Sequence, residues 1–248
     1  MSKMTEKIDL TLLLCTYNEE KRITEAIKQV LSSLKNVKFV YEIIFIDNNS
    51  TDQTSYKIAE NIKNNSNCKL LVNEKNIGKG GSIKKGINLS KGKYVMIFDP
   101  DLEYESNDIL RMFDKIKFSK YDFIIGSRRL NKKFNFSNLY KDKNKGLNYI
   151  LNYLGVFLLT IMINILYKQS ITDSASALKI FNSEFIKKVK LKRNGFNLDF
   201  ELICKTAISN GKITEIPINY YPRSKQEGKK IKAVKDGSSS FLAILIDR

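Results

Sequence analysis

The amino-acid sequence predicts an α/β protein with a mostly parallel sheet flanked by helices. Short apolar segments alternate with helical periodicities over roughly the first 100 residues, a pattern typical of βαβ units. Each apolar segment ends in polar residues, which parallel strands bring together at one edge of a sheet. The chain has 248 residues, of which 42% are hydrophobic, so it can build the core of one ordinary α/β domain.

The expected strands are short apolar segments bounded by polar residues. They are Leu10–Cys15, Tyr41–Ile46, Lys69–Asn73, Tyr94–Phe98, Tyr121–Ile125, Leu178–Phe181 and Ile213–Tyr221. Pro217 and Pro222 place the last of them at a sheet edge, because proline cannot donate to a strand ladder.

The expected helices show apolar residues at three- and four-residue spacing. The first opens at Glu19 and Glu20, and the second is capped by Ser50 or Thr51 and runs to about Asn64. Further helices are expected through Ile83 to Leu89, over Ile109–Phe118, and from Phe196 to about Asn210.

Three acids follow the strand Tyr94–Phe98 at alternate positions, Asp99, Asp101 and Glu103. Unpaired carboxylates are costly in a core, so they are expected at the carboxyl end of the strand, where open α/β sheets place ligands. Alternate residues of an extended segment point the same way, so the carboxylates can converge on a divalent cation, Mg²⁺ or Mn²⁺. The alternative for an isolated Asp-x-Asp is a turn with solvated acids.

Glycine-rich and basic segments accompany the expected strand ends. Residues 76–82 contain a glycine cluster that matches neither a P-loop nor a dinucleotide fingerprint and, taken alone, is a flexible turn. Arg128 and Arg129 follow the strand after the acids, where guanidinium groups suit either a phosphate or a solvated surface. The lysine-rich segment 223–232 is either solvated or closes over phosphates.

The chain carries 43 lysine and arginine residues against 26 acids, a net charge of +17. This charge favours nucleic acid, an anionic membrane surface or a phosphorylated substrate, although an AT-rich genome produces the same bias. No nucleic-acid-binding signature is present, so nucleic acid is not the expected partner. The absence of histidine excludes Ser-His-Asp and Cys-His catalysis.

The three cysteines, Cys15, Cys68 and Cys204, have neither zinc nor disulfide spacing, and the polar N-terminus does not resemble a signal peptide. A reducing, cytoplasmic setting is therefore expected. Leu147–Tyr167 has no charged residue over 21 positions, but three asparagines interrupt it. It can lie at a membrane interface, pack in the core or span a bilayer. The lysines before it favour an anionic bilayer surface, so we expect a peripheral protein on the cytoplasmic face of the membrane.

Several short motifs occur in an order that resembles glycosyltransferase family 2, in the branch of dolichyl-phosphate mannose synthase and polyprenyl-phosphate glycosyltransferases. The motifs are Thr16–Glu19, Asp47–Thr54, Asn76–Gly80, Asp99–Glu103, Gly126–Arg128, Asp173 with Leu178–Phe181, Glu215–Ile218, and Arg223 with Gly228–Ile231. Each is weak alone, but eight in order are strong, and they cover the chain from about Leu10 to its end.

The resemblance implies a GT-A (Rossmann-like) fold, a nucleotide-diphosphate sugar of the GDP-mannose or UDP-glucose class, a divalent metal and a polyprenyl phosphate acceptor. The residues that it implies for the nucleotide sugar are Cys15, Tyr17, Glu19, Ile46, Asp47, Asn48, Lys79, Arg223, Lys229 and Lys230. Asp99 and Asp101 face the sugar diphosphate, with Asp101 and Glu103 on the metal. Arg128, with Lys145 and Asn148, meets the acceptor phosphate.

Four positions depart from the family pattern. Glu103 stands where some members have glutamine, and this glutamate is expected to keep metal binding. Cys15 stands where proline is usual, and Asn48 stands where a second aspartate is usual at the nucleobase. Asn144 stands where the family commonly has an acceptor-side arginine, for which Lys143 or Lys145 can substitute.

The predicted function is a metal-dependent, inverting transfer of a hexose to a polyprenyl phosphate at a membrane surface, with Asp99, Asp101 and Arg128 as catalytic residues. An ionised phosphate acceptor needs no general base, so the lack of histidine is no obstacle. Residues 1–130 are expected to bind the nucleotide sugar, 131–170 to form amphipathic membrane and acceptor helices, and 171–248 to complete the catalytic domain. The alternatives are the same catalysis on a glycan or protein, and a basic nucleotide- or nucleic-acid-binding module without catalysis.

Overall fold

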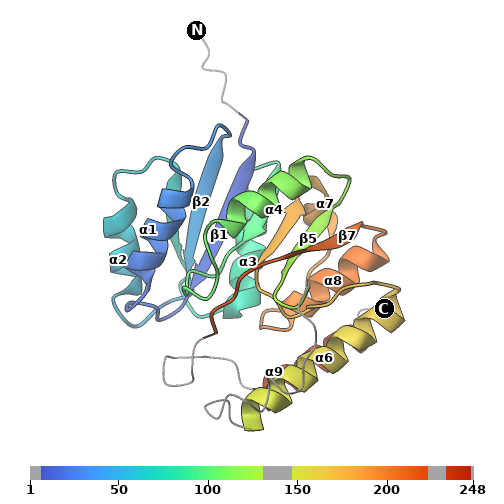
Figure 1. Ribbon diagram of the computed structural model, residues 1–248. Coiled ribbons are helices and arrows are strands. Elements are labelled where there is room, and N and C mark those ends of the chain that lie inside the picture. Colours follow the sequence, from blue (N-terminus) through green and yellow to red (C-terminus); the bar gives the residue numbers. More distant parts are fainter. Residues whose placement is uncertain (1–6, 131–146, 223–232, 247–248) are drawn as a thin grey trace.

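The computed structural model describes residues 7–130, 147–222 and 233–246, and Figure 1 shows their arrangement. The strands are β1 (Leu10–Thr16), β2 (Tyr41–Asp47), β3 (Cys68–Val72), β4 (Tyr94–Ile97), β5 (Phe123–Ser127), β6 (Lys179–Asn182) and β7 (Ile213–Pro217). The helices are α1 (Ile23–Ser33), α2 (Thr54–Ile62), α3 (Gly78–Leu89), α4 (Asp108–Lys117), α6 (Leu147–Tyr167), α7 (Ser183–Lys188), α8 (Leu198–Ile208) and α9 (Ala233–Ile246).

These strands form one sheet in the order β3-β2-β1-β4-β6-β5-β7, and the prediction of a mostly parallel α/β fold is confirmed. Only β6 runs against its neighbours within this sheet, between β4 and β5. The strand nearest the C-terminus, β7, lies at the edge, as its prolines predicted. The sheet is therefore completed by a strand that enters its middle from the second half of the chain.

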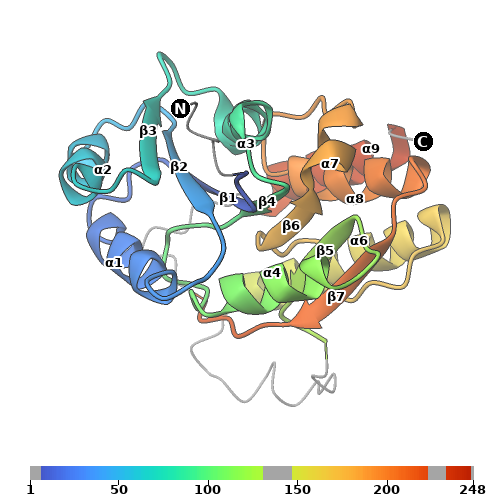
Figure 2. The same cartoon turned by 90° about the horizontal axis from the view of Figure 1, so that it is seen from above.

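Helices cover both faces of the sheet, as Figure 2 shows from above. One core cluster packs α1, α2 and α4 against the sheet through residues such as Val30, Ile58 and Met112. The other packs α3, α7 and α8 against the opposite face, with Ile87 and Leu202 among its members. Two buried faces explain why the central strands read as continuous apolar runs rather than as alternating patterns.

Two helix starts differ from the prediction. The first helix begins at Ile23 rather than at Glu19, because Asn18 adopts a left-handed backbone conformation with φ of 50°. The second begins at Thr54, after the expected caps. Ser50 Oγ instead donates to Asp47 Oδ1 at 2.5 Å. This hydrogen bond joins the loop after β2 to the last residue of the strand.

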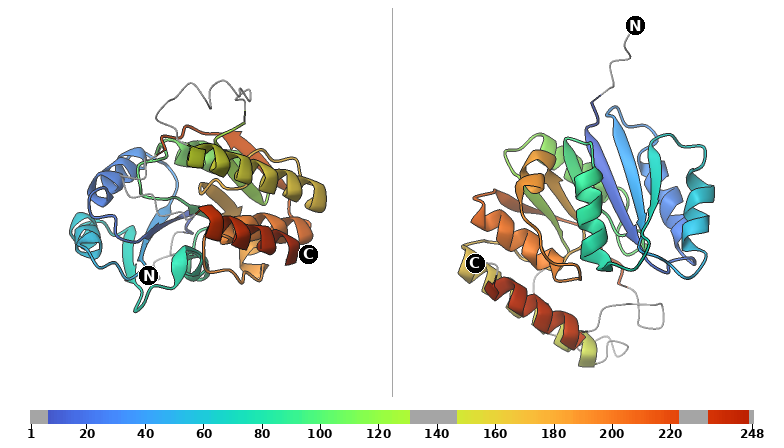
Figure 3. Two further views of the ribbon diagram at one scale, coloured as in Figure 1. Left: turned by 90° about the horizontal axis from the view of Figure 1, so that it is seen from below. Right: turned by 180° about the vertical axis from the view of Figure 1, so that it is seen from behind.

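Helices α6 and α9 lie side by side beyond the main helical layer, as Figures 1 and 3 show. Their carboxyl ends meet where Tyr167 Oη donates to the carbonyl oxygen of Ile244 at 2.5 Å. On the inner side, Ile163 is fully buried, and Asn164 Nδ2 donates to the carbonyl oxygen of Ile171 at 2.8 Å. Within the described ranges, every helix is too short or too polar to cross a bilayer.

Candidate active site

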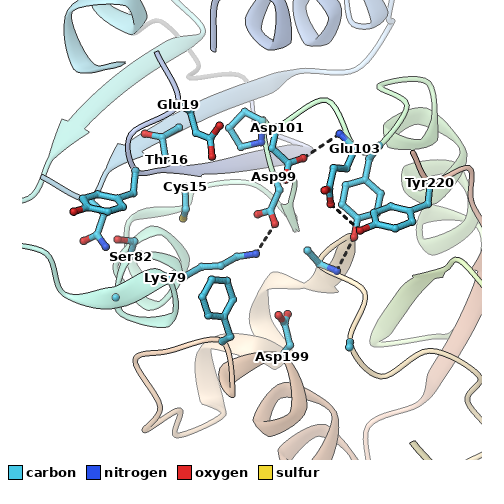
Figure 4. A pocket seen from close by; sticks show the side chains of 18 of the residues that line it. Cys15, Thr16, Glu19, Lys79, Ser82, Asp99, Asp101, Glu103, Asp199 and Tyr220 are labelled. Atoms are coloured by element: carbon cyan, nitrogen blue, oxygen red, sulfur yellow. Dashed lines mark hydrogen bonds and ion pairs between the residues drawn. The ribbon is translucent and has the colours of Figure 1, made fainter. Parts of the chain in front are cut away.

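A cavity of about 370 Å³ opens at the carboxyl edge of the sheet and is lined by several strand ends (Figure 4). The predicted residues that line it are Cys15, Tyr17, Glu19, Asn48, Lys79, Asp99, Asp101, Glu103 and Arg128. Ile46 and Asp47 are fully buried and do not line it. Asn148 lies on α6, where only the backbone is described. Lys145, Arg223, Lys229 and Lys230 lie outside the described residues.

The acidic loop after β4, Asp99 to Glu103, supplies three carboxylates to this cavity. The chain leaves the extended conformation after Ile97, and Leu102 adopts φ of 65°, so alternation along a strand does not aim the carboxylates as predicted. Asp101 Oδ1 accepts from the backbone amide of Glu103 at 3.1 Å. Among the residues that the structure describes, no three acidic or cysteine side chains are arranged to hold a metal ion.

Asp99 is nevertheless suited to a cation. One of its oxygens, Oδ2, accepts from Lys79 Nζ at 2.5 Å. The other, Oδ1, is buried and has no hydrogen-bond partner in the described structure. A buried carboxylate oxygen without a partner is costly unless a ligand satisfies it, so Asp99 has room for one more positive group.

Lys79 lies in the first turn of α3 and brings a positive charge to the centre of the cavity. Burial works against the ammonium, but the carboxylates of Asp99 and Asp199 raise the pKa of Lys79 above its ordinary value. Its Nζ also lies 5.8 Å from the centre of the Phe196 ring. Lys79 is therefore a fixed cation, held in place to meet an anionic ligand.

The glycines at the start of α3 are required by a close approach of backbone to backbone, and they form the first turn of the helix rather than a flexible turn. A Cβ on Gly78 would lie 2.2 Å from the carbonyl oxygen of Asn194, and Gly78 has φ of 78°. A Cβ on Gly80 would lie 2.8–2.9 Å from backbone atoms of the segment Arg193–Gly195. Glycine here lets the lysine-bearing helix pack directly on the segment that leads to α8.

Gly80→Ala is expected to lower the free energy of unfolding by about 1–3 kcal/mol, because only backbone atoms surround the added methyl group. Urea unfolding measures this loss. Gly155→Ala is the matched control, since a Cβ at Gly155 meets no atom within 4 Å. Equal stability of the two variants would contradict the packing role assigned to Gly80.

Asn48 ties the end of β2 to the glycine-rich segment. Its Nδ2 donates to Asn76 Oδ1 at 2.8 Å, and its Oδ1 accepts from the backbone amide of Ile77 at 2.9 Å and from Asn73 Nδ2 at 3.2 Å. An aspartate at this position has no amide to donate to Asn76. The asparagine that departs from the family pattern thus matches an asparagine partner on the next loop.

Arg128 follows β5 and is held in a buried, two-point ion pair. Its Nε and Nη2 donate to the two oxygens of Asp173, each at 2.7 Å, and its guanidinium lies 4.9 Å from the centre of the Tyr220 ring. Asp173 is fully buried; burial opposes its charge, but Arg128 holds the pKa of that carboxyl below its usual range. Asp173 uses two of the five guanidinium N–H groups, which leaves three for other acceptors.

Cys15 is a lining residue without the chemistry of a nucleophile. Burial, reinforced by the charge of Asp99, raises the pKa of its thiol to about 12. A neutral thiol is a poor nucleophile and a poor metal ligand at neutral pH.

Sequence reasoning did not select several other lining residues: Tyr104, Phe196, Asp199 and Tyr220. The rings of Tyr104 and Tyr220 lie 5.3 Å apart, and Tyr220 Oη donates to Glu103 Oε2 at 2.8 Å. In the sequence, Asp199 is distinguished only by its position near the start of a helix. Acids are common there because they interact favourably with the helix dipole, so this position does not by itself indicate a functional residue. Their role depends on long-range packing that the linear pattern does not contain.

Comparisons with known proteins identify relatives of this chain. The model of the family described as "Glycosyl transferase family 2" matches residues 11–190. A dolichyl-phosphate beta-glucosyltransferase of Dictyostelium discoideum is 28% identical over 227 residues, which are 87% of this chain and 67% of that protein. A dodecaprenyl-phosphate galacturonate synthase of Rhizobium johnstonii is 24% identical over 188 residues, which are 75% of this chain and 51% of that protein.

The solved structures that resemble this chain include glucosyl-3-phosphoglycerate synthase of Mycobacterium tuberculosis, with a TM-score of 0.71 at 15% identity. The likeness covers 97% of this chain and 80% of that one, and at this identity it speaks for the fold, which is GT-A-like. A complex of the same enzyme with Mn²⁺, UDP and its product gives a TM-score of 0.66 at 14% identity, with the same coverage. With the family model matching most of its length, the chain belongs to glycosyl transferase family 2 and is a glycosyltransferase.

Proposed function

We propose that this protein transfers a hexose from a nucleotide-diphosphate sugar to a polyprenyl phosphate at a membrane surface, in a metal-dependent reaction that inverts the anomeric centre. One observation carries the proposal. A single cavity at the sheet edge combines an acidic loop with two held cations, Lys79 and Arg128, from different elements. These cations can bind two phosphorylated substrates at the same time, one at each basic side chain.

On the donor side, the leaving group is a nucleoside diphosphate, whose growing negative charge must be neutralised. Lys79 supplies a fixed positive charge without a proton transfer, since its pKa is raised by Asp99 and Asp199 although burial works against it. The proposed donors are UDP-glucose or GDP-mannose, and UDP in the complex of the mycobacterial enzyme supports the first.

The acidic loop fits a divalent cation in chemistry, because its ligands are hard oxygens and Asp99 Oδ1 is buried without a partner. Asp99, Asp101 and Glu103 would hold the ion after their side chains rearrange, because as described these three carboxylates are not grouped around one point. A bound Mg²⁺ or Mn²⁺ supplies charge neutralisation at the diphosphate. Mn²⁺ in the mycobacterial complex supports this assignment.

On the acceptor side, Arg128 is the proposed contact with the phosphate. Its fork is fixed by Asp173, so three further N–H groups are held in a defined orientation at the cavity. A phosphate is already ionised near neutral pH, so its oxygen attacks the anomeric carbon directly and no side chain has to remove a proton. Direct displacement inverts the configuration, which fits a chain without histidine and with a neutral Cys15 thiol.

The proposed membrane contact is the outer apolar face of α6 and α9. Leu158 and Ile165 on α6 are 64% and 71% exposed, and Leu242 and Ile246 on α9 are 51% and 64% exposed. Large apolar side chains exposed on two adjacent helices are unfavourable in water, and contact with a bilayer surface would bury them. Three free cysteines further support a location at the cytoplasmic face.

Replacing Leu158, Ile165, Leu242 and Ile246 together by serine is expected to weaken binding to anionic vesicles at least about tenfold, because each side chain loses a favourable transfer of about 1.5–3 kcal/mol. Vesicle flotation measures the bound fraction. Tyr56→Ser with Phe118→Ser is the control, since both side chains are exposed on other surfaces. Unchanged flotation of the fourfold variant would contradict the membrane contact.

The activity itself is tested with the purified chain, Mn²⁺ or Mg²⁺, a polyprenyl phosphate in vesicles and radiolabelled UDP- and GDP-sugars. We expect label to enter the organic solvent phase with one donor. Donor hydrolysis without lipid label would replace the lipid acceptor by a glycan or a protein. No turnover with any donor would contradict the proposed function.

A further inference from the structure

We propose that Asp199 and Phe196 form the binding site of the donor hexose. In this hexose site the Asp199 carboxylate accepts hydrogen bonds from sugar hydroxyls, and Lys179 positions that carboxylate. This inference rests on the proposed function and specifies where the transferred sugar binds. Asp199 and Phe196 line the cavity, and Lys179 is buried beside Asp199. None of the three has a role in the proposed contacts with the donor diphosphate or the acceptor phosphate.

Asp199 lies in the first turn of α8, and its carboxylate faces the cavity below Lys79 (Figure 4). It shares this cavity with Asp99, so it stands next to the predicted diphosphate position. A sugar attached to that diphosphate must lie within a few ångströms of it. Asp199 is therefore in the place where hydroxyl groups of the donor have to be bound.

The carboxylate is held by only one of its oxygens. Asp199 Oδ1 accepts from Lys179 Nζ at 2.7 Å, and Lys179 is fully buried on β6 and also donates to the carbonyl oxygen of Ser176. Oδ2 of Asp199 has no hydrogen-bond partner in the part of the chain that is described, although the side chain retains 10% exposure. One oxygen is thus anchored, and the other is left for a ligand with hydroxyl donors.

Phe196 adds an apolar surface beside this carboxylate. It lines the same cavity three residues before Asp199 and is half-buried, with Lys79 Nζ 5.8 Å from the centre of its ring. A hexose presents hydroxyl groups at its rim and C–H groups on its face. A carboxylate and an aromatic ring side by side match both, whereas a phosphate would be repelled by Asp199.

A purely structural role for Asp199 would be to neutralise Lys179. Burial lowers the pKa of Lys179 in spite of the Asp199 carboxylate, and Lys179 Nζ donates both to Asp199 Oδ1 and to the carbonyl oxygen of Ser176. The two roles predict different results for Asp199→Asn, which keeps an oxygen to accept from Lys179 and loses the negative charge at Oδ2.

The test compares the Kd values of UDP and UDP-glucose, and of GDP and GDP-mannose, by calorimetry with Mn²⁺ present. For the pair that binds the wild type, we expect Asp199→Asn to weaken the nucleotide sugar about 10- to 100-fold and to leave the free nucleotide within about threefold. Phe196→Leu, which does not touch the Lys179 pair, is expected to weaken the nucleotide sugar about 3- to 10-fold with the same selectivity.

Asp108→Asn is the matched control, because Asp108 is a buried aspartate with a cationic partner, Arg111, outside the cavity. It is expected to change neither Kd. The proposed hexose site would be overturned if Asp199→Asn or Phe196→Leu changed the Kd of the nucleotide and of the nucleotide sugar equally. It would also be overturned if neither Kd changed. If Asp199→Asn does not fold, Phe196→Leu decides. A wild type that binds no nucleotide would instead overturn the proposed function, which is a different result.

Discussion

Arg128→Gln is expected to lower the free energy of unfolding by about 3–5 kcal/mol and to abolish transfer, because it leaves a buried carboxylate without its partner. Asp173 is fully buried and accepts three hydrogen bonds from Arg128, two from the guanidinium and one from the backbone amide. Glutamine carries no charge to compensate this carboxylate. Urea unfolding gives the stability, and the lipid-extraction assay gives the activity.

Among the described residues, the charge of Arg129 also lowers the pKa of Asp173, but the hydrogen bonds to this carboxylate come from Arg128. Glu215 already accepts from the backbone amides of Thr172 and Asp173 at 2.7 and 2.9 Å, so it fixes this turn but adds a second acid. Lys188→Gln is the control, since Lys188 and Glu184 are 73% and 82% exposed in their pair. A stability loss no larger than that of the control would contradict a buried pair at the acceptor end of the cavity.

Lys79→Met is expected to lower kcat/KM for the nucleotide sugar by about 10²- to 10³-fold, because it removes a fixed cation from the leaving diphosphate. The Lys79 side chain is only 17% exposed and is paired with Asp99 in the cavity. Steady-state kinetics over a range of donor concentrations measure the change. Lys28→Met, on the exposed face of α1, is the control and is expected to leave kcat/KM unchanged.

The same variant separates two roles of Lys79. If the lysine only balances Asp99, added Mn²⁺ should restore activity, since a divalent ion can compensate the carboxylate. If it stabilises the leaving diphosphate, kcat stays low at saturating Mn²⁺. We expect the second result, and full recovery of kcat with Mn²⁺ would contradict the role assigned to Lys79.

The parts of the fold that sequence reasoning predicted are those written in local patterns. Short apolar runs gave most strands to within one or two residues, and the polar residues after β1, β2 and β4 predicted a common edge where ligands bind. Pro217 predicted the edge strand, because a missing amide restricts where a strand can lie.

What the sequence did not predict depends on contacts between distant segments. The insertion of β6 between β4 and β5 joins parts of the chain more than 50 residues apart, and no local pattern encodes it. Gly78 and Gly80 in the first turn of α3 are explained only by the backbone of Arg193–Gly195 that packs on them. Asp173 was part of a motif without a role until its pair with Arg128 was seen.

The acidic loop after β4 is the proposed site of hexose transfer to a polyprenyl phosphate. The most direct measurement is the initial rate of lipid labelling by wild type and Asp101→Asn, at saturating Mn²⁺ and with the donor that labels the lipid. Asp101 lines the cavity and is only 9% exposed, so the substitution removes one charge and little shape. We predict labelling by the wild type and a rate at least about 100-fold lower in the variant. Equal rates would show that the acidic loop is not the site of the chemistry.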